Sequence, residues 1–271
     1  MAHTLTPEAD ALLDTEFPVL DKGFVRLVDY MGGDERIVAA ARVSYGKGTK
    51  TVREDEVLIN YLMRHEHTSP FEQVMLTFHV KLPIFVARQW IRHRTARVNE
   101  ISGRYSVMKD ECYVPAAETL RTQSTINKQG RAETPVSADA AARIVKELES
   151  GQREAYARYE SMLAEDLARE VARIGLPLSL YTEWYWQIDL HNLFHFLKLR
   201  LDAHAQWEIR EYAKIMAAIT RAVAPLAFAA FERYELGRVA FSQETVQWLR
   251  ENLPRDKEIP LELRERLDVK D

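Results

Sequence analysis

The chain has 271 residues, and its 37 Lys and Arg against 41 Asp and Glu give a net charge of −4. This balance argues against a general DNA-coating protein, which requires an excess of cations. With 46% hydrophobic and 29% charged residues, the composition is that of a globular protein of one or two domains. The single cysteine, Cys112, excludes an intrachain disulfide and a cysteine-based zinc site, and it favours the cytoplasm as the compartment.

No segment has the pattern of a secretion signal or a membrane span. The first twenty residues lack a basic start followed by an apolar run. Nowhere do about 18 apolar residues follow one another without a charge. We therefore expect neither a leader nor a membrane partner.

The first elements are a short strand and a helix. Residues 24–31 read as a strand, and Asp34 is expected to cap a helix that continues to about Ser44. The glycines and lysines of the loop 44–50 are compatible with phosphate binding, but the phosphate-loop pattern is incomplete, so a plain surface turn is the alternative.

The next segment predicts a helix, a capped turn and a clear strand. A helix over 54–65 is expected to group Val57, Leu58, Tyr61, Leu62 and His65 on one face. Ser69 and Glu72 have the spacing of a capping box, with Pro70 at the first helical position. Over 76–82, apolar residues alternate with polar ones, which predicts a strand with one buried face.

Later segments predict mostly helices. We expect helices over 84–94, 137–163 and 165–174, and an irregular excursion over 116–136.

The last strong signals are one strand and one long helix. Residues 181–188 predict an aromatic strand, and Asp189 is a suitable N-cap for a helix that reaches about Val223. Shorter helices follow at 226–234 and 242–252. Because helices and strands do not alternate regularly, we predict an α+β fold with an antiparallel sheet.

The segment 88–105, RQWIRHRTARVNEISGRY, is rich in arginine and contains a single acidic residue. In a helix over 84–94, Gln89, Arg92 and His93 would share one face. Guanidinium groups stay charged and bind phosphate through two parallel hydrogen bonds, which favours an anion site. A solvated basic face or a salt-bridge patch between subunits is the alternative on spacing alone.

The same segment resembles the signature of the flavin-dependent alternative thymidylate synthases. Arg92-His93-Arg94, seven residues and then Ser102 match RHR-x7-S, and the continuation to Tyr105 is similar too. Other segments resemble the family in the same order: AARVS (40–44), HEHTSPFEQ (65–73), IFVARQW (84–90), ARIGLPLSLYT (172–182) and LRLDAHAQWE (199–208). The similarity runs from about residue 23 to residue 234.

The resemblance implies an activity and an assembly. It implies a homotetramer whose mixed or antiparallel sheet is flanked by long helices, with active sites shared between subunits. The reaction would make dTMP from dUMP by reductive methylation, without a cysteine nucleophile. The carbon donor would be 5,10-methylenetetrahydrofolate, and NADPH-reduced FAD would supply the hydride. Residues 23–235 would form the family domain, between an N-terminal extension (1–22) and a C-terminal helix with a charged tail (236–271).

The resemblance also implies a set of dUMP contacts. These are Gln89, Trp90, Ile91, Arg92, Glu100, Ile101, Ser102, Gly103, Arg104, Arg173 and Arg200. Arg104 and Arg173 are suited to the phosphate, with Arg173 reaching it from a neighbouring subunit; on its local pattern alone, Arg173 would stabilise a helix end. By the resemblance, Arg200 corresponds to the catalytic arginine of the family. The role suits its chemistry, because a guanidinium beside the N3–C4=O edge stabilises an ionised uracil.

The FAD contacts implied by the resemblance overlap with these. They are Ser69, Arg92, His93, Arg94, Glu100, Asp189, Leu190, His191 and His195. Positive charge from Arg or protonated His favours the anionic reduced flavin. His67 and Tyr105 are candidates for stacking on folate or flavin. The chain departs from the family at Asp189, where Asn is common and could donate as well as accept, and at Arg97, where a small Ser is common.

Two possible nucleophiles receive other roles. Ser102 is assigned to substrate binding, because no base is placed beside it by the sequence. Cys112, in the apolar context ECYVP, is interpreted as a small buried hydrophobe.

Two rival functions compete with this interpretation. The pair His191 and His195, with Asp202, His204, His65 and His67 elsewhere, could serve a metal-dependent hydrolase acting on nucleotides, although no HExxH motif is present. The mixture of arginines with Trp90 and Tyr105 could instead bind single-stranded nucleic acid, although the negative net charge and the single short patch argue against it. We expect no metal and no nucleic acid.

Overall fold

An antiparallel sheet lies at the centre of the computed structural model, which describes residues 6–43, 52–126 and 128–252. The predicted loop 44–50 lies outside the described residues. Within them, five strands have the order β1-β2-β3-β7-β4 and every neighbouring pair is antiparallel. Their bounds are β1 Glu16–Val19, β2 Gly23–Met31, β3 Met75–Pro83, β7 Tyr181–Asp189 and β4 Arg97–Glu100. The predicted α+β class is therefore confirmed.

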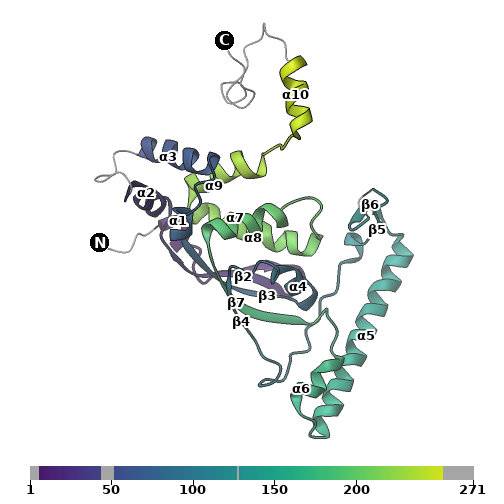
Figure 1. The fold of residues 1–271 in the computed structure, drawn as a ribbon. Coiled ribbons are helices and arrows are strands. Elements are labelled where there is room, and N and C mark those ends of the chain that lie inside the picture. The colour runs from purple at the N-terminus through teal and green to yellow at the C-terminus, as the bar shows by residue number, and fades with distance from the viewer. Residues whose placement is uncertain (1–5, 44–51, 127, 253–271) are drawn as a thin grey trace.

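Helices pack on one face of this sheet, and a helical arm stands beside it (Figure 1). The elements at or next to the sheet are α4 (Ile84–Trp90), α7 (Leu190–Arg200) and α8 (Trp207–Val223). Around them lie α1 (Pro7–Asp10), α2 (Asp34–Arg42), α3 (Val52–Arg64) and α9 (Pro225–Phe231), which a π-helix (Glu232–Leu236) continues, and α10 (Gln243–Asn252) follows. The arm consists of the hairpin β5 (Arg121–Gln123) and β6 (Arg131–Pro135), α5 (Ala138–Ala164) and α6 (Arg169–Ala172).

The alternating pattern of β3 and β7 builds the core under these helices. Leu76, Phe78, Val80 and Leu82 are fully buried, and so are their neighbours on β7, Trp184, Trp186 and Ile188. Trp90 is also fully buried, with its ring 5.7 Å from Trp184 and 4.7 Å from Phe196, measured between ring centres. Large aromatic side chains of this kind dominate the burial energy of a core. Trp90 thereby attaches the end of α4 to the sheet.

One predicted helix ends earlier than expected, and another is interrupted. The helix expected over 84–94 ends at Trp90, because the charged residues that follow have no apolar surface to bury and tertiary packing supplies most helix stability. The long helix expected from Asp189 to Val223 is two helices, α7 and α8. Between them the Asp202 carboxylate accepts from the backbone N–H of His204 at 2.7 Å, a local turn that competes with helix. Asp189 does cap α7 as predicted.

Three other local expectations are wrong. The Asp34 side chain does not cap its own helix; it accepts from the N–H groups of Leu226 and Ala227, at 2.7 and 2.9 Å, and so caps α9. Ser69 forms no capping box, although the helical turn expected after it is present as a single 3-10 turn, Phe71–Gln73. On α3 the expected face is exposed at Val57, Tyr61 and His65 and buried only at Leu62, and the helix also buries Asp55, Ile59 and Met63, which were not expected.

The regions expected to be irregular contain strands. The segment 116–136 includes the β5–β6 hairpin, and β4 forms within the arginine-rich segment 88–105, where no strand was predicted. As an edge strand β4 carries the exposed Arg97, and charge on an edge discourages pairing with another sheet. β1 lies before the predicted domain boundary at residue 23 but pairs with β2 in the same sheet. Among the described residues, no helix combines the length and apolar character needed to cross a membrane.

Candidate nucleotide and flavin site

Arg200, the last residue of α7, contacts the end of α4 and the turn after it. Its Nε donates to Nε2 of His93 at 3.1 Å, and its Nη2 donates to the backbone carbonyl of Gln89 at 3.2 Å. The structure therefore joins the predicted catalytic arginine to one predicted dUMP contact and one predicted flavin contact. Gln89, His93 and Arg200 are called the Arg200 cluster below.

His93 is half-buried, and its surroundings hold it in the neutral form. Burial, the charge of Arg200 and the nearby His195 lower the pKa of His93 to about 4. Because Nε2 accepts from Arg200, the neutral ring must carry its proton on Nδ1. Burial also lowers the pKa of Arg200. A positive charge from His93 is therefore not available at neutral pH, and the arginines must supply it.

Three of the predicted histidines line one cavity of about 250 Å³ beside α7. These are His67, the folate or flavin candidate, and the flavin candidates His191 and His195. The ring of His195 lies 5.9 Å from that of His93, so the cavity opens next to the Arg200 cluster. Lys198, which no motif indicated, also lines the cavity, one turn after the predicted histidines on the same helix.

A second group forms around the glycine of the arginine-rich segment. Gly103 is buried against Arg173, and a Cβ atom at Gly103 would lie 3.1 Å from Cδ of Arg173. The hydroxyl of Ser102 accepts from the backbone N–H of Arg104 at 3.3 Å. Arg104 in turn forms an ion pair with Glu170 at 3.2 Å, and both side chains are more than half exposed. The group of Ser102, Gly103, Arg104 and Arg173 is called the glycine loop below.

β4 carries Glu100 to the edge of the sheet. Its Oε1 accepts from the Thr182 hydroxyl at 2.6 Å, and the next residue, Ile101, donates its N–H to the carbonyl of Glu183 at 2.9 Å. These two bonds hold the start of the glycine loop against β7. Across the part of the chain that the structure describes, no hydrogen bond, ion pair or ring contact joins the glycine loop to the Arg200 cluster.

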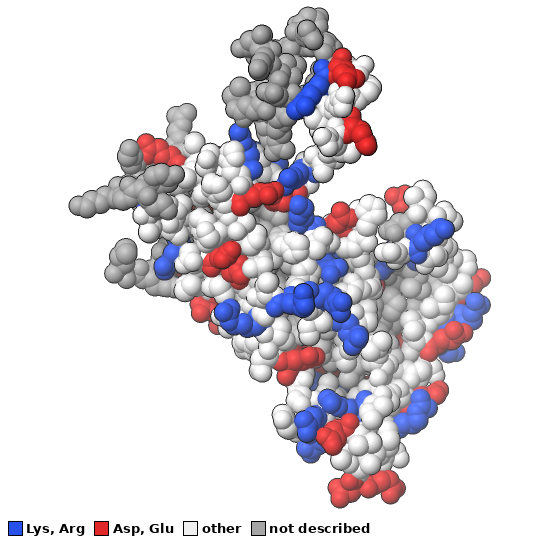
Figure 2. Space-filling view, in the orientation of Figure 1, with Lys and Arg blue, Asp and Glu red and all other residues white. Residues whose placement is uncertain are grey.

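Arg92 and Arg94 of the arginine-rich segment, and Arg173 outside it, remain without an acidic partner among the described residues. Within the described ranges, Arg92, Arg94 and Arg173 have no carboxylate within ion-pair distance, and all three are exposed. Figure 2 shows a run of basic side chains across the middle of the molecule, over the region of α4 and the sheet. Guanidinium groups left unpaired at a surface are suited to bind phosphate or another anion.

The remaining predicted residues take different positions. The side chains of Trp90 and Leu190 are fully buried in the core, so only their backbones can face a ligand. Exposed positions are taken by Ile91, Ile101, Ser69 and Tyr105, the last with 75% of its surface accessible. Asp189 uses both carboxylate oxygens on Asn192, at 2.9 Å to its backbone nitrogen and 2.7 Å to its side-chain amide.

A partly buried polar network adjoins the Arg200 cluster, and motif reasoning assigned it no role. The amide of Gln89 donates to Oε1 of Gln206, whose Nε2 donates to Oε2 of Glu208 at 2.8 Å. Oε1 of Glu208 accepts from Arg131 at 2.7 Å and from the Tyr113 hydroxyl at 3.4 Å. The segment AQWE, which holds Gln206 and Glu208, was part of the resemblance and could have pointed to this network.

The histidine and acidic residues do not converge in a way that would hold a metal. Among the described residues, no group of three or more His, Cys, Asp or Glu side chains is placed to share an ion. His204 pairs with Asp202 at 2.8 Å in the turn between α7 and α8. No observation therefore favours the hydrolase alternative.

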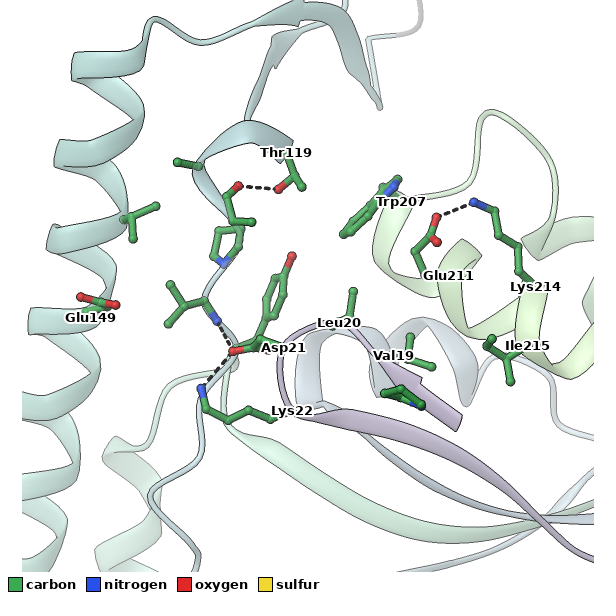
Figure 3. Close-up of a pocket in the computed structure, with 17 residues that line it drawn as sticks. Val19, Leu20, Asp21, Lys22, Thr119, Glu149, Trp207, Glu211, Lys214 and Ile215 are labelled. Atoms are coloured by element: carbon green, nitrogen blue, oxygen red, sulfur yellow. Dashed lines mark hydrogen bonds and ion pairs between the residues drawn. The ribbon is translucent and has the colours of Figure 1, made fainter. Parts of the chain in front are cut away.

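A larger cavity, of about 750 Å³, lies elsewhere, between the β1–β2 turn, α5 and α8 (Figure 3). Four of its charged lining residues are paired with one another: Lys22 bonds Asp21 and Lys214 bonds Glu211, at 2.9 and 2.7 Å. None of the predicted site residues lines it. The smaller, histidine-lined cavity is the one that the predicted residues share.

Together, an antiparallel α+β fold, unpaired guanidinium groups and a histidine-lined cavity define a protein whose site has the chemistry to accept an anionic ligand. Residues 26–226 match the family described as thymidylate synthase complementing protein, which covers most of the chain. The chain belongs to this family.

Named relatives and solved structures agree with this assignment. The flavin-dependent thymidylate synthase of Treponema denticola is 64% identical over 238 residues, which is 88% of this chain and 90% of the relative. The enzyme of the same name from a strain of Thermus thermophilus is 60% identical over 233 residues, or 86% of this chain and 84% of the relative. The crystal structure of the UMP/dUMP methylase PolB from Streptomyces cacaoi, bound with 5-Br dUMP, has a TM-score of 0.74 and 32% identity. The match to PolB covers 81% of this chain and 99% of that chain.

Proposed function

We propose that the chain is a flavin-dependent thymidylate synthase that methylates dUMP to dTMP and uses FAD as its cofactor. The observation that carries this proposal is the Arg200 cluster, which joins the predicted catalytic arginine to a nucleotide contact and a flavin contact within a family of this activity. The names of the relatives and the nucleotide held by the PolB structure support it.

The predicted flavin contacts fit an anionic dinucleotide such as FAD. Arg92 and Arg94 are exposed and lack an acidic partner in the described residues, so they are free to bind phosphate or the pyrimidine edge of the flavin. His191 and His195 line the cavity and offer ring faces and hydrogen bonds. When bound, FAD supplies the hydride for reduction of the carbon unit. Neutral His93 keeps an N–H at Nδ1 to donate to the ligand.

Arg200 has the chemistry required to activate uracil. It is half-buried, and a guanidinium stabilises a developing negative charge more strongly where water is excluded. Its bonds to His93 and Gln89 fix its direction without neutralising its charge, because neither partner is anionic. We expect Arg200 to stabilise the ionised N3–C4=O edge of the ring.

The cysteine does not have the properties of a nucleophile. Cys112 is buried, and burial raises the pKa of its thiol, which works against formation of the thiolate. This supports methylation without a thiol adduct.

We further propose that two subunits complete each site. The glycine loop has the phosphate-binding residues and the Arg200 cluster has the base-binding ones, yet within the described residues the two groups share no contact. A homotetramer that brings the loop of one subunit to the Arg200 cluster of another would join them. Methylene-folate and NADPH as co-substrates, a cytoplasmic location and the family domain over 23–235 complete the proposal.

The proposal is tested by spectroscopy and product analysis. Purified protein is expected to bind FAD, with the flavin absorbance bands, and anaerobic NADPH is expected to bleach them, with a rate that responds to dUMP. With methylene-folate present, dTMP should form. A colourless protein that refuses FAD and leaves dUMP unbound would refute the function.

A further inference from the structure

We propose that Glu208, acting through Gln206, is a positioning residue that aims the side-chain oxygen of Gln89 at a hydrogen-bond donor of the nucleotide. This inference rests on the proposed function, because it takes dUMP as the ligand. Neither Glu208 nor Gln206 contacts Arg200, so their effect on the site passes through Gln89 alone.

The first step is that Glu208 is a carboxylate and can only accept hydrogen bonds. Its side chain is only 8% exposed, and its two oxygens accept from Arg131 at 2.7 Å and from Gln206 at 2.8 Å. A carboxylate accepts hydrogen bonds and donates none. Gln206 must therefore turn its NH₂ group toward Glu208, and its carbonyl oxygen away from it.

The second step is the amide of Gln89. Oε1 of Gln206 points to Gln89, and two carbonyl oxygens cannot bond each other, so Gln89 presents its own NH₂ group. Its Oε1 is left pointing elsewhere and accepts no hydrogen bond from the residues that the structure describes. A glutamine without such a fixed neighbour can rotate its amide by half a turn and exchange donor for acceptor. Here the orientation of the Gln89 amide follows from the Glu208 carboxylate, which can only accept hydrogen bonds.

The carboxylate that sets this orientation is itself held firmly. The Arg131 guanidinium donates to the backbone carbonyl of Thr119 at 3.1 Å and lies 5.2 Å from the centre of the Trp207 ring. The Tyr113 hydroxyl gives Glu208 a further donor at 3.4 Å. Glu208, Gln206 and Gln89 thus form a chain of hydrogen bonds, called the relay below. The β5–β6 hairpin holds its Glu208 end through Arg131, and its Gln89 end lies in the predicted nucleotide site.

The acceptor lies where a nucleotide donor is expected. Arg200 bonds the backbone carbonyl of Gln89, so the Gln89 side chain extends from the residue that holds the catalytic guanidinium. Before the ring ionises, dUMP offers two neutral donors, the uracil N3–H and the 3′-hydroxyl, and a carbonyl oxygen can accept from either one. A nucleotide analogue with a hydrogen-bond acceptor in place of this donor should bind more weakly, because two acceptor atoms would then face each other at Oε1 of Gln89 with no proton between them.

The experiment measures nucleotide discrimination by the FAD-loaded enzyme. Three ligands are titrated: dUMP, 2′,3′-dideoxyuridine monophosphate, which lacks the hydroxyl, and N3-methyl-dUMP, which lacks the N–H. Binding is followed by the flavin absorbance change or by calorimetry. In Glu208→Gln the new amide can donate or accept, so Gln206 and Gln89 can both reverse. We expect the penalty for losing the contacted donor to shrink by about two- to tenfold, the value of one net hydrogen bond.

A second variant and a matched control keep the outcome clear. Gln206 is exposed, so Gln206→Ala is expected to fold and should show the same smaller penalty. Asp34→Asn makes the same change from carboxylate to amide at a residue outside this network, which caps α9, and should leave the penalty unchanged. The analogue whose penalty shrinks identifies the donor. Equal penalties in wild type and both relay variants would overturn the inference while the proposed function stands. Failure of the wild type to bind dUMP would overturn both.

Discussion

Lowering the pH should destabilise this protein, and His93 should contribute more to that loss of stability than a histidine with an ordinary pKa. The pKa of His93 falls from 6.5 in the unfolded chain to about 4 in the folded one. The folded state therefore binds fewer protons than the unfolded state between these values, and stability falls as the pH drops through that window. At about 1.4 kcal/mol for each pKa unit the upper limit is roughly 3 kcal/mol. Because the ring is half-buried and water screens it, we expect about 1–3 kcal/mol.

The assay compares urea unfolding of the wild type and His93→Asn from pH 7.5 to pH 4. The Asn oxygen still accepts from Arg200 but does not titrate, so the losses caused by all other groups appear in both proteins. The stability of the wild type should decline relative to the variant between about pH 6.5 and 4. A pH-independent difference would refute the idea that Arg200 and burial keep His93 neutral. Direct titration of the His93 ring by NMR gives an independent measurement of the same pKa.

Further predictions concern the active arginine, the cysteine, a packed glycine and a helix cap. Arg200→Ala should lower kcat as well as raise KM for dUMP, and wild-type turnover at saturating dUMP would contradict its role. Cys112→Ala should keep turnover within about twofold and lose less than about 2 kcal/mol of stability, as measured by product formation and urea unfolding. Gly23→Ala should cost about 1–3 kcal/mol in unfolding free energy, because the new methyl group would overlap the Tyr212 hydroxyl. Asp189→Ala should cost about 1 kcal/mol in the same measurement through the lost cap of α7.

The sheet core could be predicted because its signal is local and repeated. On β3 and β7 every second residue is large and apolar, and burying one side of a strand needs no knowledge of distant partners. The hydrophobic pattern around Trp184 and Trp186 therefore already indicated which face of the sheet is covered.

The errors arose where a distant partner decides the local structure. The Asp34 side chain has the right position to cap its own helix, but α9, far later in the chain, presents two N–H groups that it bonds instead. On α3, Val57 and Tyr61 have the expected helical spacing and still face outward, because the packing of α9 against the helix selects the face with Ile59. Periodicity finds an amphipathic helix but does not choose between two nearly equal apolar stripes.

In the candidate site, too, the sequence indicated which residues take part but not which of them lie in contact. The motifs identified Arg200, His93 and Gln89 individually, but only the fold joins α4 to the end of α7, where burial and the Arg200 guanidinium lower the pKa of the His93 imidazole. Both groups would otherwise carry charge at mildly acidic pH, and two cations in contact repel each other. The pair can coexist because one member gives up its proton. The cluster can therefore present one positive charge with a fixed direction, which is what stabilising a single ionised uracil edge requires.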